Sequence, residues 1–181
     1  MNLKELLEFI PEEGILKLGS QRMVILPADS MGRLIRMITS TMGKEVLDEY
    51  MFELGEASGR KDAETLKRDF APESEMDWIT LGPAMHSWEG IVHAVPEKVR
   101  FDRSRPTFLM SGRWENSFYA EQWLDQLGQS KEPVCSLLVG YAKGYSSVFI
   151  GAETEARELQ CIAQGHEYCR WEIRLKEDWT D

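Results

Sequence analysis

The stretch ELQCIAQGHEYC, residues 158–169, places a carboxylate three residues before one thiol and a second thiol eight residues after the first. It holds two of the three cysteines in the chain, and the third is Cys135. Either Glu158 and the three thiols hold an ion together, or the cysteines are ordinary small residues of the interior. The choice decides whether the fold is braced by a metal or by packing alone.

Zinc binds four ligands in a tetrahedron, drawn from thiolate, imidazole and carboxylate. Residues 153–175 are typical of two strands joined by the turn QGHEY, so Cys161 and Cys169 can meet across a hairpin. Cys135 follows Pro133, which is expected to open a helix, and can approach from that element. With Glu158 as fourth ligand no position is left for water, which is typical of a structural site.

Three observations keep other interpretations open. Free cysteines are among the most buried residue types and behave as small hydrophobes. A Cys161–Cys169 disulfide is an alternative that a reducing compartment disfavours, and His166 in the turn is a rival ligand, although we expect it to be exposed. In a flat strand, residues 158 and 161 face opposite sides, so the metal hypothesis requires a bulge or a helical turn between them.

The composition excludes several classes of protein. The chain has 181 residues, is 43% apolar and carries a formal net charge of −10, which repels phosphate backbones and anionic lipid. We therefore expect neither nucleic-acid nor membrane binding by this chain. No apolar run reaches the ~18–20 residues of a membrane span, and the acidic start MNLKELLEFIPEEG is not a secretion signal. Few cysteines indicate a cytoplasmic protein.

Helices and strands alternate in a mixed order with hairpins, which predicts an α+β fold of helices and antiparallel sheet. In the first half we expect a helix over 3–10, a hairpin around Gly19 (14–18 and 21–27), a helix capped by Asp29 or Ser30, a second helix after Gly43, a third capped by Asp62, and a fourth over 74–90. In the second half we expect strands within 91–114, a helix from Asn116 or Ser117 to Gly128, a helix opened by Pro133 and the 153–175 hairpin.

His86, in LGPAMHSWEGIV, and Trp114, in SGRWENSFYAEQW, are candidates for binding a hydroxyl group. A phenolic hydroxyl needs an acceptor for its proton and a donor to its oxygen; a neutral imidazole nitrogen supplies the first and an indole N–H the second. The plainer interpretation is a core histidine bonded to a backbone carbonyl and a core tryptophan. The sequence contains no GxxxxGK[ST], HExxH, GxSxG or GxGxxG motif, so no catalytic machinery is evident.

Five separated strings together resemble the N-terminal sensor domain of sigma-54-dependent bacterial activators that respond to phenol, toluene and xylene. The strings are GSQRMVILPADSMGRLIRMI, LGPAMHSWEGIV, GRWENSFYAEQWLDQLG, PVCSLLVGYAKGYSSVFIG and ELQCIAQGHEYC. They occur in the family's order, and the resemblance covers about residues 14–175. It implies an activator-of-aromatic-catabolism segment, residues 1–115, used for dimerisation and the pocket, followed by a zinc-binding segment of the vinyl-4-reductase type, residues 116–181.

The resemblance also implies roles for individual residues. The family's structural zinc ligands are Cys, Glu, Cys and Cys, in the order of Cys135, Glu158, Cys161 and Cys169. In its phenol-sensing members a His and a Trp hold the hydroxyl, and His86 and Trp114 stand in the matching motifs. The expected partners are a phenol-like aromatic effector and a second copy of the chain.

In the family this sensor represses an attached AAA+ ATPase until the effector binds, and a separate module holds the DNA. We expect neither of these parts in this chain, and no enzymatic activity. Two alternatives remain at this stage. One is a small zinc-dependent enzyme of the vinyl-reductase type, which would need an open coordination position. The other is a dimerising scaffold that binds no small molecule.

Overall fold

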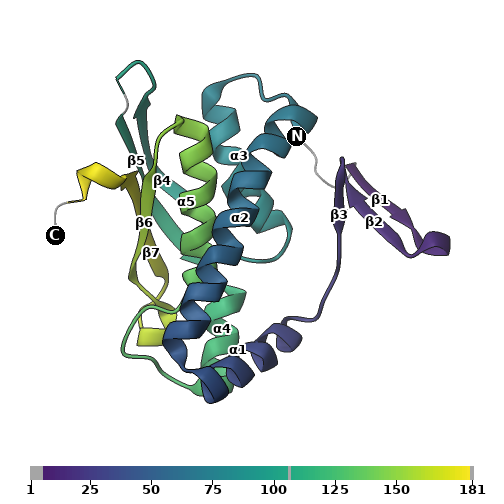
Figure 1. Cartoon of the computed structure of the whole chain (residues 1–181), viewed down its shortest axis with the longest axis vertical. Helices are drawn as coiled ribbons and strands as arrows, with labels where there is room; N and C mark the ends of the chain where they lie inside the picture. Colours follow the sequence, from purple (N-terminus) through teal and green to yellow (C-terminus); the bar gives the residue numbers. More distant parts are fainter. Residues whose placement is uncertain (1–5, 106, 180–181) are drawn as a thin grey trace.

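The structure is a computed structural model that describes residues 6–105 and 107–179, and it contains two antiparallel sheets (Figure 1). The larger sheet has the strand order β4-β5-β7-β6 and the smaller has the order β1-β2-β3. The strands of the larger sheet are β4 (His93–Asp102), β5 (Thr107–Glu115), β6 (Thr154–Gln160) and β7 (Cys169–Leu175). Those of the smaller sheet are β1 (Leu7–Ile10), β2 (Ile15–Leu18) and β3 (Gln21–Met23). This arrangement confirms the predicted α+β class.

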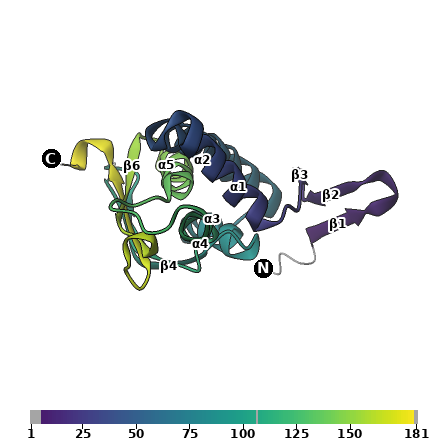
Figure 2. The same cartoon turned by 90° about the horizontal axis from the view of Figure 1, so that it is seen from below.

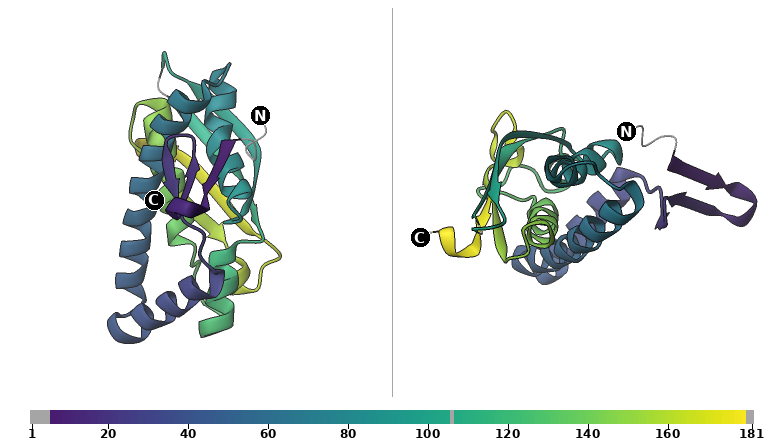
Figure 3. Two further views of the ribbon diagram at one scale, coloured as in Figure 1. Left: turned by 90° about the vertical axis from the view of Figure 1, so that its right-hand side faces the viewer. Right: turned by 90° about the horizontal axis from the view of Figure 1, so that it is seen from above.

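The helices lie to one side of the larger sheet, and the smaller sheet projects beyond them (Figures 2 and 3). Helices α3, α4 and α5 lie between the larger sheet and the pair α1 and α2 (Figure 2). Their bounds are α1 (Ala28–Met42), α2 (Lys44–Phe70), α3 (Glu75–Trp88), α4 (Phe118–Leu127) and α5 (Ser136–Ile150). No helix in the described part of the chain combines the length and apolarity needed to cross a membrane.

The inner face of the larger sheet forms one wall of the core. Along β5 and β7 every second residue is buried, because successive side chains of a strand point to opposite faces. The buried set includes Met110, Trp114, Trp171 and Ile173. These side chains face the helices, so the sheet and α5 enclose an apolar interior.

Helices α2 and α5 approach each other through glycines on both sides. A Cβ atom at Gly55 would overlap the backbone oxygen of Leu137, and one at Gly140 would overlap the backbone oxygen of Phe52. Gly59 and Gly144 make equivalent approaches one turn along. Only residues without a side chain allow two helix backbones to come this close.

Three local predictions were wrong. Residues 7–10 form strand β1 rather than a helix, because their backbone pairs with β2 in the register Leu7↔Leu18 to Ile10↔Ile15; the predicted residues 3–5 lie outside the described part. Asp62 caps no helix: α2 runs unbroken through it, and its carboxylate accepts hydrogen bonds from Gln21 and Tyr141. Neither Asp29 nor Ser30 caps α1, whose N-cap is Pro27.

Other boundaries are confirmed. The β2–β3 hairpin turns at Gly19, which has a φ of +57°, and Gly43 separates α1 from α2. Ser117 caps α4 by accepting a hydrogen bond from the backbone N–H of Ala120. Helix α5 begins at Ser136, slightly after the expected Pro133. The boundary expected between residues 115 and 116 stays a prediction.

The close approach of α2 and α5 predicts that Gly140→Ala destabilises the protein by about 2–3 kcal/mol, because the new methyl group meets backbone that cannot move aside. The matched control is Gly32→Ala in α1. There the methyl would meet the end of the Gln122 side chain, which can rotate away, and alanine favours the helix by ~1 kcal/mol. Urea unfolding measures both variants, and an equal effect of the two substitutions would contradict the packing argument.

Candidate functional site

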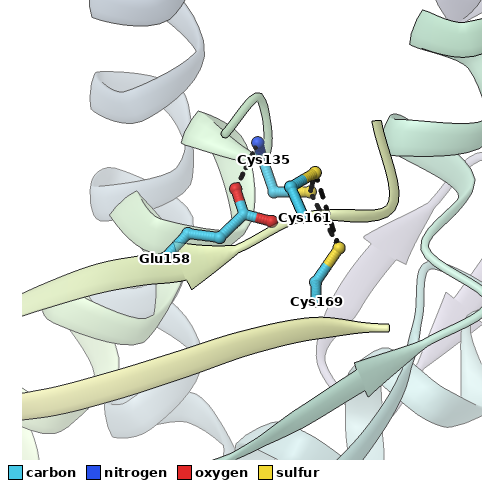
Figure 4. A group of neighbouring side chains, drawn as sticks. All are labelled: Cys135, Glu158, Cys161 and Cys169. Atoms are coloured by element: carbon cyan, nitrogen blue, oxygen red, sulfur yellow. Dashed lines mark hydrogen bonds between the residues drawn. The ribbon is translucent and has the colours of Figure 1, made fainter. Parts of the chain in front are cut away.

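Four side chains from three parts of the chain converge at one end of the larger sheet (Figure 4). Cys135 is the N-cap of α5, Glu158 lies in β6, Cys161 follows the end of β6, and Cys169 is the first residue of β7. Their candidate ligand atoms all lie within 4.8 Å of one another. The structure therefore brings together the four residues that the sequence singled out.

The spacing of the three sulfur atoms matches a tetrahedral metal site. The Sγ atoms are separated by 4.0 Å (Cys135–Cys161), 3.9 Å (Cys135–Cys169) and 3.6 Å (Cys161–Cys169). A tetrahedron with Zn–S bonds of about 2.3 Å places its sulfurs about 3.8 Å apart. A disulfide requires about 2.05 Å, so the cysteines are free thiols, and His166 is exposed and outside the cluster.

A bulge removes the conflict between positions 158 and 161. The β6–β7 register shifts between Glu158 and Gln160, and Leu159 is left exposed. A 3-10 helix, Ile162–Gln164, follows at once with Cys161 as its N-cap. The extra residue and the turn direct Glu158 and Cys161 to the same side of the hairpin.

The cluster is buried and incompletely satisfied without a cation. Oε2 of Glu158 accepts a hydrogen bond of 2.8 Å from the backbone N–H of Cys135, while Oε1 is buried and has no partner among the described residues. Burial raises the pKa of Glu158 to about 8 and raises that of Cys135 as well. A divalent cation would stabilise the charged forms instead, so this donor set fits zinc.

A second feature, a small cavity, lies between the larger sheet, α3 and α5. Its volume is about 40 Å³. It is lined by Ile79, Pro83, His86, Ala94, Met110, Trp114, Leu138, Tyr141, Ala142, Tyr145, Ser146, Trp171 and Ile173. Both His86 and Trp114 thus lie on the walls of one largely apolar cavity.

His86 is a neutral imidazole with free nitrogen atoms. Burial lowers its pKa to about 3, so the ring is uncharged at neutral pH. Its ring packs against that of Tyr141, with centroids 3.7 Å apart. Neither ring nitrogen hydrogen-bonds to another described residue, so the plainer interpretation of a core histidine tied to a carbonyl does not hold.

The two tryptophans of the sheet lie side by side in the cavity wall. Trp114 of β5 and Trp171 of β7 stack with ring centroids 5.8 Å apart and an interplanar angle of 26°. The indole nitrogen of Trp114 makes no hydrogen bond to any other described residue. The cavity therefore offers both an imidazole nitrogen and an indole donor that the protein itself leaves unused.

Hydrogen bonds connect the cavity wall to the small sheet. The Tyr141 hydroxyl donates to Asp62 over 3.0 Å, and the Gln21 side chain of β3 donates to the other carboxylate oxygen over 2.5 Å. Burial raises the pKa of Asp62. Burial, together with the nearby Asp62 charge, raises the pKa of Glu89 to about 7, so two buried carboxyl groups lie close to Tyr141.

Sequence reasoning did not assign Tyr141, Tyr145 or Trp171 to the cavity. A signal existed for Trp171, because the alternation in CRWEIRL places it on the face of Cys169 and Ile173. For Tyr141 and Tyr145 the helical spacing indicated only a buried face. The role of Asp62 left no sequence signal, since its partners are distant in the chain.

Comparison with known proteins gives two family matches. Residues 2–102 match the family model described as "Activator of aromatic catabolism", and residues 113–175 match the model of the vinyl-4-reductase-type domain. The phenol regulator MopR of Acinetobacter guillouiae is 30% identical over 180 residues, and the transcriptional regulatory protein XylR of Pseudomonas putida is 28% identical over 180 residues. Each alignment covers 99% of this chain but 32% of the relative, so the chain spans about a third of their length.

Solved structures agree with these matches. The phenol-responsive sensory domain of the transcription activator PoxR, solved with phenol, superposes with a TM-score of 0.93 and is 32% identical. The alignment covers 99% of this chain and 89% of that one. A trafficking protein particle complex subunit 3 from Naegleria fowleri shares the fold, with a TM-score of 0.51, 10% identity, and coverage of 85% of this chain and 98% of that one.

The family model for activators of aromatic catabolism accounts for more than half of the residues, and a sensory domain of the same kind superposes along almost the whole length. The chain belongs to the family of activators of aromatic catabolism.

Proposed function

We propose that this chain is the sensor domain of a bacterial sigma-54-dependent transcriptional activator of the cytoplasm and that it binds phenol or a related small aromatic. The observation that carries the proposal is the pair His86 and Trp114, whose unused polar atoms lie in an apolar cavity. The phenol-bound sensory domain of PoxR supports it, since that fold is nearly the same. This function fits better than an enzyme or a scaffold.

The chemistry of the cavity suits a phenol. The ring replaces water against apolar walls, while the neutral His86 accepts the hydroxyl proton and the Trp114 N–H donates to the hydroxyl oxygen. An effector without a hydroxyl leaves both groups unpaired in a dry site, at a cost of ~1–3 kcal/mol each. The pocket therefore discriminates phenol from toluene by hydrogen bonding rather than by size.

Binding also requires a change of shape. A cavity of about 150 Å³ accommodates benzene in another protein, whereas this one measures about 40 Å³. The Tyr141 ring covers His86, so an incoming ring must displace it. Tyr141 is tied through Asp62 to Gln21 of β3, so its displacement alters the contact between the helices and the small sheet.

An effector shifts a signalling equilibrium only through different affinities for two conformations. We infer that the effector favours the conformation in which Tyr141 has moved off His86. In the full-length regulator this state would relieve repression of the attached AAA+ ATPase. The chain itself would contact neither DNA nor a membrane.

The four-residue cluster is proposed to hold a structural zinc ion through Cys135, Glu158, Cys161 and Cys169. A four-ligand zinc supplies cross-linking rather than catalysis. It would join the start of α5 to both strands of the terminal hairpin. Because α5 and β7 both line the cavity, the ion would fix two of its walls.

A second copy of the chain is the proposed partner of the small sheet. The sheet, the segment that follows it and the end of α3 border a groove of about 640 Å³. Among its lining residues Phe9, Val24, Ile25 and Leu26 are each more than 60% exposed. Contiguous exposed apolar surface of this kind marks an interaction site, and the predicted dimerisation through residues 1–115 places it here.

Trp114→Phe should weaken phenol binding about five- to tenfold, because one neutral hydrogen bond is lost while the ring volume is largely kept. Toluene affinity should change little, and His86→Ala should likewise weaken phenol more than toluene. Trp123→Phe is the matched control, since Trp123 is buried outside the cavity. Calorimetric titration measures all four proteins, and equal weakening of phenol and toluene would exclude the hydroxyl role.

Glu158→Gln should lower zinc affinity by at least about tenfold and the melting temperature by about 5 °C, which corresponds to roughly 2 kcal/mol for a chain of this size. Glu155→Gln on the same strand is the control, because Glu155 pairs with Arg157 outside the cluster. Metal analysis, X-ray absorption and thermal unfolding provide the measurements. Full zinc content in the Glu158 variant, or an open coordination position in the wild type, would refute the structural assignment.

Ile25→Asp should convert a dimer into a monomer, because a charge buried in an apolar interface is not solvated. Light scattering should give the wild type twice the 20.8 kDa mass of one chain. Met76→Asp is the control, as Met76 is exposed but lies outside the groove. A monomeric wild type at tens of micromolar, or a dimeric Ile25→Asp variant, would argue against this interface.

A further inference from the structure

Trp171 occupies a position in the cavity wall that the hydroxyl site does not use. It lies in β7, opposite Gly112 of β5 and Glu158 of β6, and is 2% exposed. A Cβ atom at position 112 would come within 2.8 Å of Cζ2 of the indole. The absence of a side chain there lets the Trp171 ring lie against the sheet and beside Trp114.

The indole nitrogen of Trp171 has no hydrogen-bond partner. Among the residues that line the cavity, it is the one fully buried nitrogen or oxygen atom for which the described part of the chain provides none. Leaving a buried donor unpaired costs about 1–3 kcal/mol, and buried polar groups in native proteins are nearly always satisfied. A partner for this N–H is therefore expected from outside the chain.

The neighbouring polar groups of the cavity are already engaged. Tyr141 donates to Asp62, Tyr145 donates to the backbone oxygen of Trp78, and Ser146 donates to the backbone oxygen of Ala142. These hydroxyl groups therefore serve other partners, and the His86 nitrogen is assigned to the effector hydroxyl. An acceptor for Trp171 must come from the molecule that enters the cavity.

We propose that Trp171 donates a second hydrogen bond to the effector, and that the preferred effectors carry an acceptor oxygen next to the hydroxyl, as in catechol and 2-methoxyphenol. The inference rests on the proposed function of the cavity. Because the rings of Trp114 and Trp171 are in stacking contact, their N–H groups serve adjacent positions of one ligand. An oxygen across the ring from the hydroxyl lies away from this pair.

The test compares positional isomers in the wild type and in Trp171→Phe. Wild-type protein should bind catechol and 2-methoxyphenol about three- to tenfold more tightly than hydroquinone and 4-methoxyphenol, as one neutral hydrogen bond allows. Trp171→Phe should abolish this preference and leave phenol affinity within about twofold. Trp123→Phe should retain the preference. Calorimetry provides the dissociation constants.

A second measurement uses the unaltered protein, in case Trp171→Phe does not fold. The indole N–H proton resonance of Trp171 should move downfield on addition of catechol and stay near its free position with phenol. Equal shifts with the two ligands, or equal affinities for the isomers, would overturn the role of Trp171 while leaving phenol binding intact. Failure of every aromatic to bind would instead refute the proposed function itself.

Discussion

Helix α5 can lie where it does only because four glycines let its backbone touch that of α2. Gly140 and Gly144 of α5 face the backbone of α2, and Gly55 and Gly59 of α2 face that of α5. The contact leaves the opposite side of α5 free to cover the sheet. One end of α5 begins at Cys135 and its middle carries Tyr141, so a single helix position determines the metal cluster and the cavity together.

The cluster and the cavity are also joined through the sheet. Trp114 of β5 pairs with Cys169 of β7 in the strand register, and Trp171 pairs with Glu158. A shift of the β6–β7 hairpin by one residue would turn Trp171 away from the cavity and Cys169 away from the other sulfurs. Register at this end of the sheet therefore controls both features, and a bound ion would hold that register.

Much of the site could be predicted, because its residues lie in short motifs with chemical meaning. The four candidate ligands, His86 and Trp114 were all identified from residue type, spacing and the family resemblance, and the bulge near Glu158 followed from the pleat of a strand. The continuity of α2 could not be predicted in the same way. The glycines within it satisfy a contact with α5, and Asp62 binds partners that are far away in the sequence.

The Tyr141 contact gives the cavity a property that residue identity alone could not reveal. A ring that covers His86 keeps the cavity small, so the unliganded and liganded states must differ in the position of Tyr141. Its hydroxyl is bound to a carboxylate that also binds β3. Because Asp62 is largely buried, any movement of Tyr141 that removes its hydrogen bond leaves the carboxylate less well solvated. The free energy of ligand binding is thus coupled to the position of the small sheet, the element that carries the exposed apolar surface.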